Sequence, residues 1–392
     1  MDLNERALKL HEENIGKIEV VAKTPIKTKE DLSLAYTPGV AEPCRKIAQN
    51  PDDVYKYTAK GNLVAVVSDG SAVLGLGNIG AKASLPVMEG KAVLFKSFAN
   101  VDAFPICVDT QDNEEIIKIV KYLGATFGGI NLEDIAAPRC FEIEDRLKQE
   151  MDIPIFHDDQ HGTAICVLAA IFNSLKIIKK DITKIKIVVN GGGSAGIAIS
   201  KILMASGAQN VCICDLNGIL NPEVSESMLN WAHEEMAKVT NPEKLRGSLA
   251  EALKGADVFI GVSAPGIVTK EMVATMNKDA IVLAMANPTP EIFPAEALAG
   301  GARIIGTGRS DFPNQVNNVL AFPGVFRGAL DVRAKDINDE MKVAAAKALA
   351  EFIPEQDLNE EYILPNPLDP SVAAKVAKAV AKAARDSGVA RL

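Results

Sequence analysis

The segment Ile185-Lys-Ile-Val-Val-Asn-Gly191-Gly-Gly-Ser-Ala-Gly196 decides the fold of this chain. A β-branched strand, Ile185–Val189, runs into a loop with the GxGxxG spacing, and a helix is expected to follow. In a Rossmann-type unit Gly191 allows the tight turn, Gly193 lets the backbone approach a pyrophosphate, and Gly196 lets helix and strand pack closely. The pyrophosphate would lie on the free N–H groups at the helix start, Ser194 and Ala195. The alternative is a glycine-rich turn of another α/β fold.

An acidic residue ends the next expected strand. Asp215 lies 24 residues after Gly191. A carboxylate at this place accepts hydrogen bonds from both adenosine ribose hydroxyls and repels a 2′-phosphate. Because no Arg or Lys follows in Leu216–Leu220, NAD is favoured over NADP, which stays possible. The alternative for Asp215 is a surface acid.

Outward from this loop, short β-branched runs alternate with helix-period segments along the whole chain, which predicts an α/β protein with parallel sheets. We place a boundary near residue 160. It separates an N-terminal α/β domain for substrate and metal, residues 1–160, from a doubly wound, Rossmann-type dinucleotide-binding domain with C-terminal helices, residues 161–392. A long helix is expected from about Gly162 to Ile178, and the C-terminal helices are expected to pack back onto the first domain.

Composition excludes some classes of protein. The 392 residues carry a formal net charge of −9, which argues against a nucleic-acid partner. The longest apolar run, Ala164–Phe172, has nine residues, while a membrane span needs about 20. The N-terminus has no secretory signal pattern, and the six cysteines form no CxxC pair. We therefore expect a cytoplasmic protein with no membrane partner.

Acidic residues follow two of the expected strands. Glu133 and Asp134 come after Phe127–Leu132, and Asp159 comes shortly after Ile153–Phe156. Ligands of open α/β sheets bind outside the carboxyl ends of the strands, so these carboxylates could converge on one point. Three carboxylates suit Mg²⁺ or Mn²⁺. The alternative is that the acids cap helix N-termini, where they are common.

Two further residues are candidates for proton transfer. Tyr36 precedes Thr-Pro-Gly in an expected loop, from which its hydroxyl could project into a cleft. Lys91 precedes an apolar run and could lie at the start of a helix or strand, where a nearby metal would lower its pKa. The alternatives are a packed tyrosine and a solvated lysine.

A second GxGxxG, Gly75–Gly80, does not follow its strand directly and is interpreted as a loop whose backbone passes close to another group.

Taken together, segments in one order over nearly the whole chain resemble the malic enzymes. The matching segments are Tyr36-Thr-Pro-Gly-Val40, Ser68-Asp-Gly-Ser-Ala-Val-Leu-Gly-Leu-Gly-Asn-Ile-Gly80, Gly90-Lys-Ala-Val-Leu-Phe95, Asn131-Leu-Glu-Asp-Ile135, His157-Asp-Asp-Gln-His-Gly-Thr-Ala164, the glycine loop, Ala286-Asn-Pro-Thr289 and Asn317-Asn-Val-Leu-Ala-Phe-Pro-Gly324. The length resembles the short bacterial or archaeal type. The resemblance implies oxidative decarboxylation of L-malate to pyruvate and CO₂ with reduction of NAD(P)⁺, dependent on Mg²⁺ or Mn²⁺.

By position, the resemblance also implies roles for single residues. Glu133, Asp134 and Asp159 match metal ligands, and Tyr36 and Lys91 match the catalytic pair. Asn287 and Asn318 match residues that contact malate, and Asn287 and Asn317 are placed at the cofactor, with Asn317 near the nicotinamide.

One departure concerns the loop after Asp69-Gly70. Larger eukaryotic relatives carry an arginine there that holds a malate carboxylate, whereas this chain has Ser71-Ala72. Ser71, the glycine-rich backbone, the asparagines or a basic group from elsewhere are candidates for that task.

The family implies a homodimer, with active sites that could be built across subunits. The rival functions are an enzyme on the same scaffold with another outcome, such as malolactic conversion or oxaloacetate decarboxylation, and a silent dinucleotide-binding regulator. The silent regulator would be expected to have lost the carboxylates or Lys91, which this chain retains.

Overall fold

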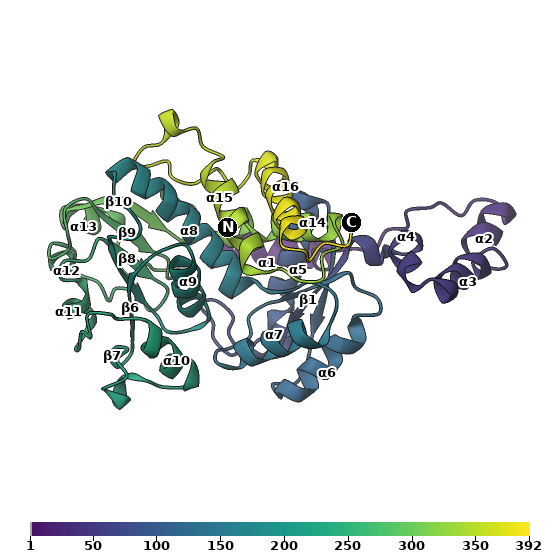
Figure 1. The fold of residues 1–392 in the computed structure, drawn as a ribbon. Helices are drawn as coiled ribbons and strands as arrows, with labels where there is room; N and C mark the ends of the chain where they lie inside the picture. The colour runs from purple at the N-terminus through teal and green to yellow at the C-terminus, as the bar shows by residue number, and fades with distance from the viewer. Residues whose placement is uncertain (1) are drawn as a thin grey trace.

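The computed structural model describes residues 2–392 and contains two β-sheets joined by a long helix (Figure 1). The first sheet is parallel throughout, with strand order β2-β1-β3-β4. Its strands are β1 (Leu63–Ser68), β2 (Asp102–Cys107), β3 (Gly129–Leu132) and β4 (Ile155–His157). The helices α5 (Gly80–Ala99), α6 (Asn113–Leu123) and α7 (Arg139–Glu150) connect them. Because β3 and β4 are parallel neighbours, with Leu132 opposite His157, the residues after both strands meet at one edge of the sheet.

The second sheet has the strand order β10-β9-β8-β5-β6-β7, in which only β7 is antiparallel to its neighbour. Its strands are β5 (Lys186–Asn190), β6 (Asn210–Asp215), β7 (Gly218–Ile219), β8 (Val258–Gly261), β9 (Ala280–Ala284) and β10 (Ala302–Thr307). The chain proceeds from β5 to β6 on one side and later to β8 on the other. This reversal beside β5 is the switch point at which doubly wound sheets bind ligands, and it confirms the Rossmann-type arrangement predicted from the glycine loop.

The remaining helices complete the fold. They are α1 (Leu3–Asn14), α2 (Lys29–Ala35), α3 (Ala41–Gln49), α4 (Val54–Tyr57), α8 (Asp158–Ile178), α9 (Ser194–Ala205), α10 (Trp231–Val239), α11 (Leu249–Leu253), α12 (Lys270–Val273), α13 (Pro294–Ala299), α14 (Phe322–Asp331), α15 (Asp339–Ala350) and α16 (Pro370–Asp386). Short 3₁₀ turns are η1 (Pro51–Asp53), η2 (Ala59–Asn62), η3 (Ser225–Ser227), η4 (Asn318–Leu320) and η5 (Glu355–Asp357).

Helix α8 joins the two sheets and begins earlier than expected. It starts at Asp158 instead of near Gly162, because acidic residues in a first turn are stabilised by the positive end of the helix. By length and composition alone α8 could cross a membrane, and 72% of its most apolar window is buried inside the protein. It packs against α9 and α15, so its apolar side chains form part of the core.

The last helix, α16, packs onto the first sheet's helix α5, as expected for the C-terminal helices, whereas α15 packs onto α8 and α16; α14 also packs onto α5. The ring of Phe95 on α5 contacts Phe322 and Phe326 of α14, with centroids 4.7 Å and 5.2 Å apart. Phe326 also meets Phe156 of β4 at 5.8 Å. These edge-on contacts fasten the end of the chain to the first sheet. The division of the chain at residue 160 stays a prediction.

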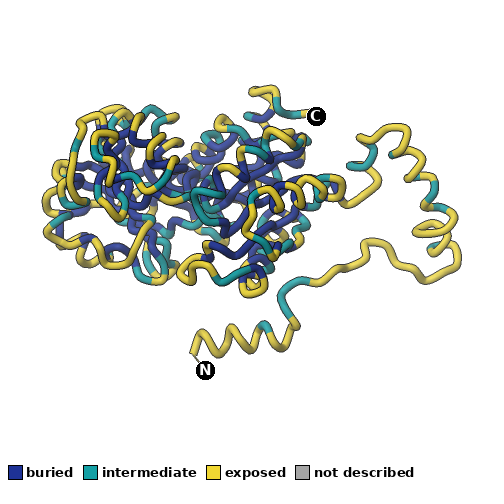
Figure 2. Tube along the Cα trace, turned by 90° about the horizontal axis from the view of Figure 1, so that it is seen from below, coloured by how far each residue is buried: buried dark blue, intermediate teal, exposed yellow. Residues whose placement is uncertain are grey.

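An N-terminal arm, residues 2–59, leaves the body of the protein. None of its residues is buried. The segment that contains α2 and α3 projects furthest from the two sheets (Figure 1), and the arm appears almost wholly exposed in Figure 2. Lys17 anchors the arm to α5 through a backbone hydrogen bond to Glu89, 2.9 Å long. The rest of this chain leaves apolar side chains of the arm uncovered, and Leu34, for example, is 70% exposed.

The aromatic contacts between α5, α14 and β4 predict a large effect of one substitution. We expect Phe326→Ala to lower the free energy of unfolding by about 3–5 kcal/mol, because it leaves a cavity among fully buried rings. Urea denaturation followed by circular dichroism measures this. Phe104→Ala removes a ring that is 42% exposed and serves as the control. Equal losses for the two variants would contradict the proposed packing.

Candidate active site

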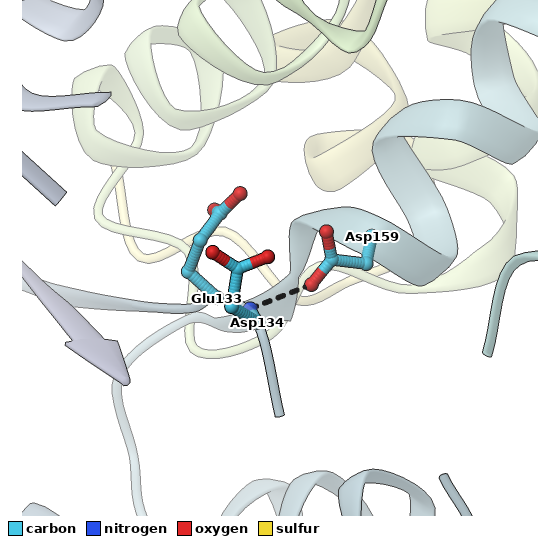
Figure 3. Close-up of side chains that lie close together, drawn as sticks. All are labelled: Glu133, Asp134 and Asp159. Carbon is cyan, nitrogen blue, oxygen red and sulfur yellow. Dashed lines mark hydrogen bonds between the residues drawn. The ribbon is translucent and has the colours of Figure 1, made fainter. Parts of the chain in front are cut away.

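Three carboxylates converge at the edge of the first sheet. Glu133 and Asp134 directly follow β3, and Asp159 lies in the first turn of α8, which follows β4. One oxygen from each lies within 4.8 Å of the other two. Figure 3 shows the three side chains gathered at one place, with the Asp134 N–H donating to Asp159 Oδ2 over 2.8 Å. The structure thus brings together the three residues that the sequence nominated, and it places Asp159 within α8.

Two of the three carboxylates are disfavoured in their charged form. Burial raises the pKa of Glu133 well above its ordinary value, and burial and Asp159 raise the pKa of Asp134 to about 7. Asp134 Oδ2 is buried and has no hydrogen-bond partner. Buried, unpaired carboxylate oxygens are costly unless a cation neutralises them. An all-oxygen donor set of this kind fits a hard divalent cation.

Lys91 lies against this cluster. Its Nζ is 2.9 Å from Glu133 Oε1, 2.6 Å from Asp158 Oδ2 and 4.3 Å from the centre of the Phe322 ring. The expectation that Lys91 starts an element was wrong, because it lies in the middle of α5. Among the protein's own groups, burial opposes the charge of Lys91, but Asp158 and Glu133 outweigh burial and raise the pKa of Lys91. The lowering expected beside a metal stays a prediction. A divalent cation bound at Glu133 would instead lower the pKa of Lys91.

Sequence reasoning missed Asp158 as a functional residue. Its side chain is fully buried, and it forms the shorter of the two ion pairs of Lys91. Gly162 is required beside it, because a β-carbon at position 162 would overlap with Asp158 Oδ1. That β-carbon would also lie 3.0 Å from the β-carbon of Asn318, so Asn318 lies beside Gly162, near Asp158. The adjacent acids in His157-Asp-Asp were the available signal, although only Asp159 was chosen.

The Ser71 hydroxyl is already engaged within the protein. It donates to Asp69 Oδ1 over 2.6 Å and accepts from the Ala136 N–H and from Arg139 Nη2, each over 2.9 Å. Arg139 also pairs with Asp69 at 2.6 Å. The fold therefore places a guanidinium at the loop where larger relatives are expected to carry an arginine. Arg139 comes from α7, 68 residues away along the chain, so no local signal revealed it.

The glycine loop has the geometry that its spacing predicted. Gly191 has φ +121°, and a β-carbon there would lie 2.6 Å from the Val262 carbonyl oxygen. A β-carbon at Gly196 would overlap with the Gly191 carbonyl oxygen, whereas one at Gly193 would meet nothing within 4 Å. Helix α9 begins at Ser194 with no side-chain cap, so no side chain occupies its first N–H groups. The open side at Gly193 leaves room for a pyrophosphate.

Asp215 ends β6 beside this loop. A β-carbon at Gly192 would lie 2.6 Å from Asp215 Oδ2, so the carboxylate lies over the glycine loop. His233 of α10, which sequence reasoning missed, places Nε2 3.2 Å from Asp215 Oδ2 and 2.9 Å from the Gly192 carbonyl oxygen. Asp215 therefore lies beside the glycine loop, and His233 contacts both of them.

The two sheets face each other through the loops that follow their strands. A β-carbon at Gly75, in the second glycine-rich loop, would lie 3.4 Å from the Asn287 carbonyl oxygen, so that loop does approach another backbone. Asn287 follows β9, and its side chain donates to the Gly308 carbonyl oxygen over 3.3 Å. Asn317 caps η4 by accepting from the Val319 N–H over 3.0 Å, and its carbonyl oxygen accepts from Cys166 Sγ.

Tyr36 is not brought to the site within this chain. It directly follows α2 in the N-terminal arm, its side chain is 67% exposed, and Lys91 lies on α5 in the body of the protein. The side chain is therefore exposed in this chain, and the expectation that its hydroxyl projects into a cleft stays a prediction. The exposure arises because no part of the arm up to residue 59 packs into the core of this chain.

Known proteins match this chain over its whole length. The family model described as malic enzyme, N-terminal domain, matches residues 15–148, and the one described as malic enzyme, NAD binding domain, matches residues 160–385. The bifunctional malic/malolactic enzyme of Bacillus subtilis is 58% identical over 392 residues, which cover 100% of this chain and 95% of that protein. The NAD-dependent malic enzyme of Geobacillus stearothermophilus is also 58% identical, over 96% of this chain and 78% of that protein.

A solved structure agrees with the fold. The malic enzyme of Pyrococcus horikoshii superimposes with a TM-score of 0.96 at 52% identity, over 100% of this chain and 92% of that one. The carboxylate cluster, the buried lysine and the glycine loop thus lie in a chain that both family models cover, and this chain belongs to the malic enzyme family.

Proposed function

We propose that the protein catalyses the oxidative decarboxylation of L-malate to pyruvate and CO₂, with reduction of NAD⁺ and dependence on Mg²⁺ or Mn²⁺. The observation that carries this proposal is the contact of Lys91 Nζ with Glu133, a member of the three-carboxylate cluster, at 2.9 Å. A lysine amine beside a divalent-cation site is the arrangement needed to take a proton from a hydroxyl group. Membership of the malic enzyme family and the names of the relatives support the choice of substrate.

The metal would be held by Glu133, Asp134 and Asp159. When bound, it would supply Lewis-acid stabilisation of negative charge that develops on the substrate oxygens. The buried Asp134 Oδ2, which lacks a partner, supports this role for the cluster.

Lys91 would take the proton of the malate hydroxyl while the C2 hydride passes to NAD⁺. Asp158 Oδ2, 2.6 Å from Lys91 Nζ, holds the amine in place and accepts a hydrogen bond from its ammonium form. The C3–C4 bond then breaks and C4 leaves as CO₂. The bonding electrons form the C2–C3 double bond, and the carbonyl π electrons move onto the C2 oxygen, which gives the enolate of pyruvate. Tyr36 would donate its hydroxyl proton to C3, which yields pyruvate.

The dinucleotide would lie along the glycine loop. Its pyrophosphate would contact the backbone at Gly191, Gly193 and Gly196 and the N–H groups of Ser194 and Ala195. Asp215 would accept hydrogen bonds from the adenosine ribose, which favours NAD⁺ over NADP⁺. The Geobacillus stearothermophilus relative is named an NAD-dependent malic enzyme, which supports this preference.

Amide groups would complete the substrate pocket. Asn318, next to Asp158, and Asn287, at the loop of Gly75, would contact malate, and Asn287 and Asn317 would lie at the cofactor, with Asn317 near the nicotinamide. Ser71 stays a proposed substrate contact, although its hydroxyl is engaged with Asp69, and Arg139 is a further candidate for the malate carboxylate.

Product analysis tests the reaction. With L-malate and NAD⁺ we expect NADH, CO₂ and pyruvate in equal amounts, loss of all three after a chelator, and a lower kcat/KM with NADP⁺. The name of the Bacillus subtilis relative makes a malolactic outcome the second candidate. Lactate formed without net NADH would support that candidate, and turnover that survives the chelator would contradict the metal requirement.

Replacement of Lys91 tests its role as the base. We expect Lys91→Ala to lower kcat for malate oxidation by at least about 10²-fold, because a positioned general base is lost. Lys96→Ala, on the same helix α5 with a 56% exposed side chain, is the matched control and should keep the activity. Rates measured by NADH absorbance that are equal in the two variants would remove Lys91 from the mechanism.

We further propose that the protein is a homodimer in which the arm of each subunit delivers Tyr36 to the partner's Lys91. The arm supports this: residues 2–59 include no buried residue, and Leu32, Leu34 and Tyr36 are 49%, 70% and 67% exposed. A soluble chain rarely leaves so many large apolar side chains uncovered, and a second copy is the commonest partner.

Complementation tests the shared site. Lys91→Ala and Tyr36→Phe should each be nearly inactive as homodimers. A heterodimer of the two, purified through two different tags, has one intact site if Tyr36 acts in the partner, so about half of the wild-type activity should return. If Tyr36 acts in its own chain, both sites of the heterodimer are damaged, and activity at the level of the single variants would contradict the proposal.

We propose that the enzyme works in the cytoplasm. All six cysteines are free thiols, as expected for a protein of a reducing compartment.

A further inference from the structure

A series of close polar contacts leads from the proposed metal ligand Asp159 into the protein, although His157 Nε2, its first member, has no hydrogen-bond partner among the described residues. His157 is fully buried at the end of β4, and its Nε2 lies 3.1 Å from Asp159 Oδ2. Its other ring nitrogen, Nδ1, lies 2.9 Å from Gln160 Nε2. The same Gln160 nitrogen lies 2.9 Å from Glu144 Oε2, a carboxylate that comes from α7. None of these three side chains belongs to the three-carboxylate cluster.

The orientation of the Gln160 amide follows from Glu144. Burial raises the pKa of Glu144, but its contact with His161 outweighs burial and lowers the pKa to about 2, so the carboxylate is ionised and only accepts. The Gln160 group that faces it must therefore be the NH₂ group, which only donates. The second hydrogen of this NH₂ group points at His157 Nδ1, which must therefore accept a hydrogen bond.

This fixes the proton on the other ring nitrogen of His157. With Nδ1 accepting, the hydrogen of the neutral ring lies on Nε2, the ring atom that is 3.1 Å from Asp159 Oδ2. Asp159 and Cys140 raise the pKa of His157 against the effect of burial. The charged form of His157 would nevertheless carry its second ring proton on Nδ1, and that proton would lie directly against the Gln160 N–H. The geometry thus favours the neutral ring with Nε2–H.

Glu144 also binds the backbone just before helix α8. Its Oε1 accepts from the His157 N–H over 3.3 Å and lies 2.8 Å from His161 Nε2. The carboxylate therefore joins α7 of the first sheet to the first turn of α8, which carries Asp159. Gln160 and Glu144 are 5% and 3% exposed, and they line a crevice of about 470 Å³ between α7, α8, α9 and α15, on the far side of His157 from Asp159.

We propose that Glu144 and Gln160 are positioning residues that hold His157 in its Nε2–H form, and that His157 thereby orients Asp159 toward the divalent cation. The inference rests on the proposed metal site. Partners that orient ligands in this way typically change metal affinity by about 10–100-fold when they are removed. The side chains are buried and distant in sequence from Glu133 and Asp134, and their contacts lead only to Asp159 within the cluster.

Substitution of Gln160 tests the proposal through metal binding, without turnover. In full-length protein stripped of divalent ions, we expect Gln160→Leu to raise the Kd for Mn²⁺ by about 10–100-fold, measured from the free Mn²⁺ signal in electron paramagnetic resonance. Gln149→Leu, which lines the same crevice from α7, is the matched control and should leave the Kd unchanged. NADH affinity, followed by quenching of the single tryptophan, Trp231, should be unchanged in both variants.

The outcomes separate the possible failures. Wild-type protein that does not bind Mn²⁺ would overturn the proposed metal site itself. A Kd of Gln160→Leu equal to wild type, or weaker NADH binding in parallel with weaker Mn²⁺ binding, would overturn the positioning role. If Gln160→Leu does not fold, a second measurement on the wild-type protein tests the proposal. Long-range ¹⁵N–¹H correlations of the four histidines show which ring nitrogen of His157 carries the proton. A proton on Nδ1 of His157 would contradict the proposal, and Nε2–H alone would support it.

Discussion

The structure depends on a concentration of negative charge at one edge of the first sheet. The parallel strands β3 and β4 end side by side, and the residues that follow them supply Glu133, Asp134, Asp158 and Asp159. Lys91 is the one lysine that contacts this group among the described residues, and it neutralises only part of the charge. A further cation is the simplest way to stabilise the remaining carboxylates, and oxygen ligands select a hard divalent ion. The proposed chemistry follows from this imbalance.

Helix α8 links that charge cluster to the dinucleotide loop. Its first turn carries Asp158 and Asp159, its body forms the buried core between the sheets, and its far end leads to β5 and the glycine loop. The proposed substrate site and the proposed cofactor site are therefore connected by one helix of the core. Packing of α14 and α16 onto α5 fixes the helix that carries Lys91 as well. Both proposed binding sites are thus placed by helices in the core, while the proposed proton donor Tyr36 lies on a segment outside it.

Local patterns allowed much of this to be predicted. The glycine spacing around Gly193 and the acid at Asp215 act within one βαβ unit, and sequence shows such units directly. Acids after consecutive parallel strands likewise meet by topology, which is why Glu133 and Asp159 could be nominated together. What escaped prediction depends on distant segments. Arg139 reaches Ser71 across 68 residues, and the environment of His157 exists only after α7 packs against α8. Tyr36 could be nominated, but the proposed site places it against a partner subunit, which the sequence of one chain does not show.

The central claim is that Glu133, Asp134 and Asp159 bind one divalent cation beside Lys91. A crystal of the protein grown with Mn²⁺, measured near the manganese absorption edge, tests this most directly. The account predicts a strong anomalous peak about 2.0–2.3 Å from an oxygen of each of the three carboxylates, near the distances known for small hard cations. A manganese peak elsewhere, with none among these carboxylates at saturating Mn²⁺, would contradict it.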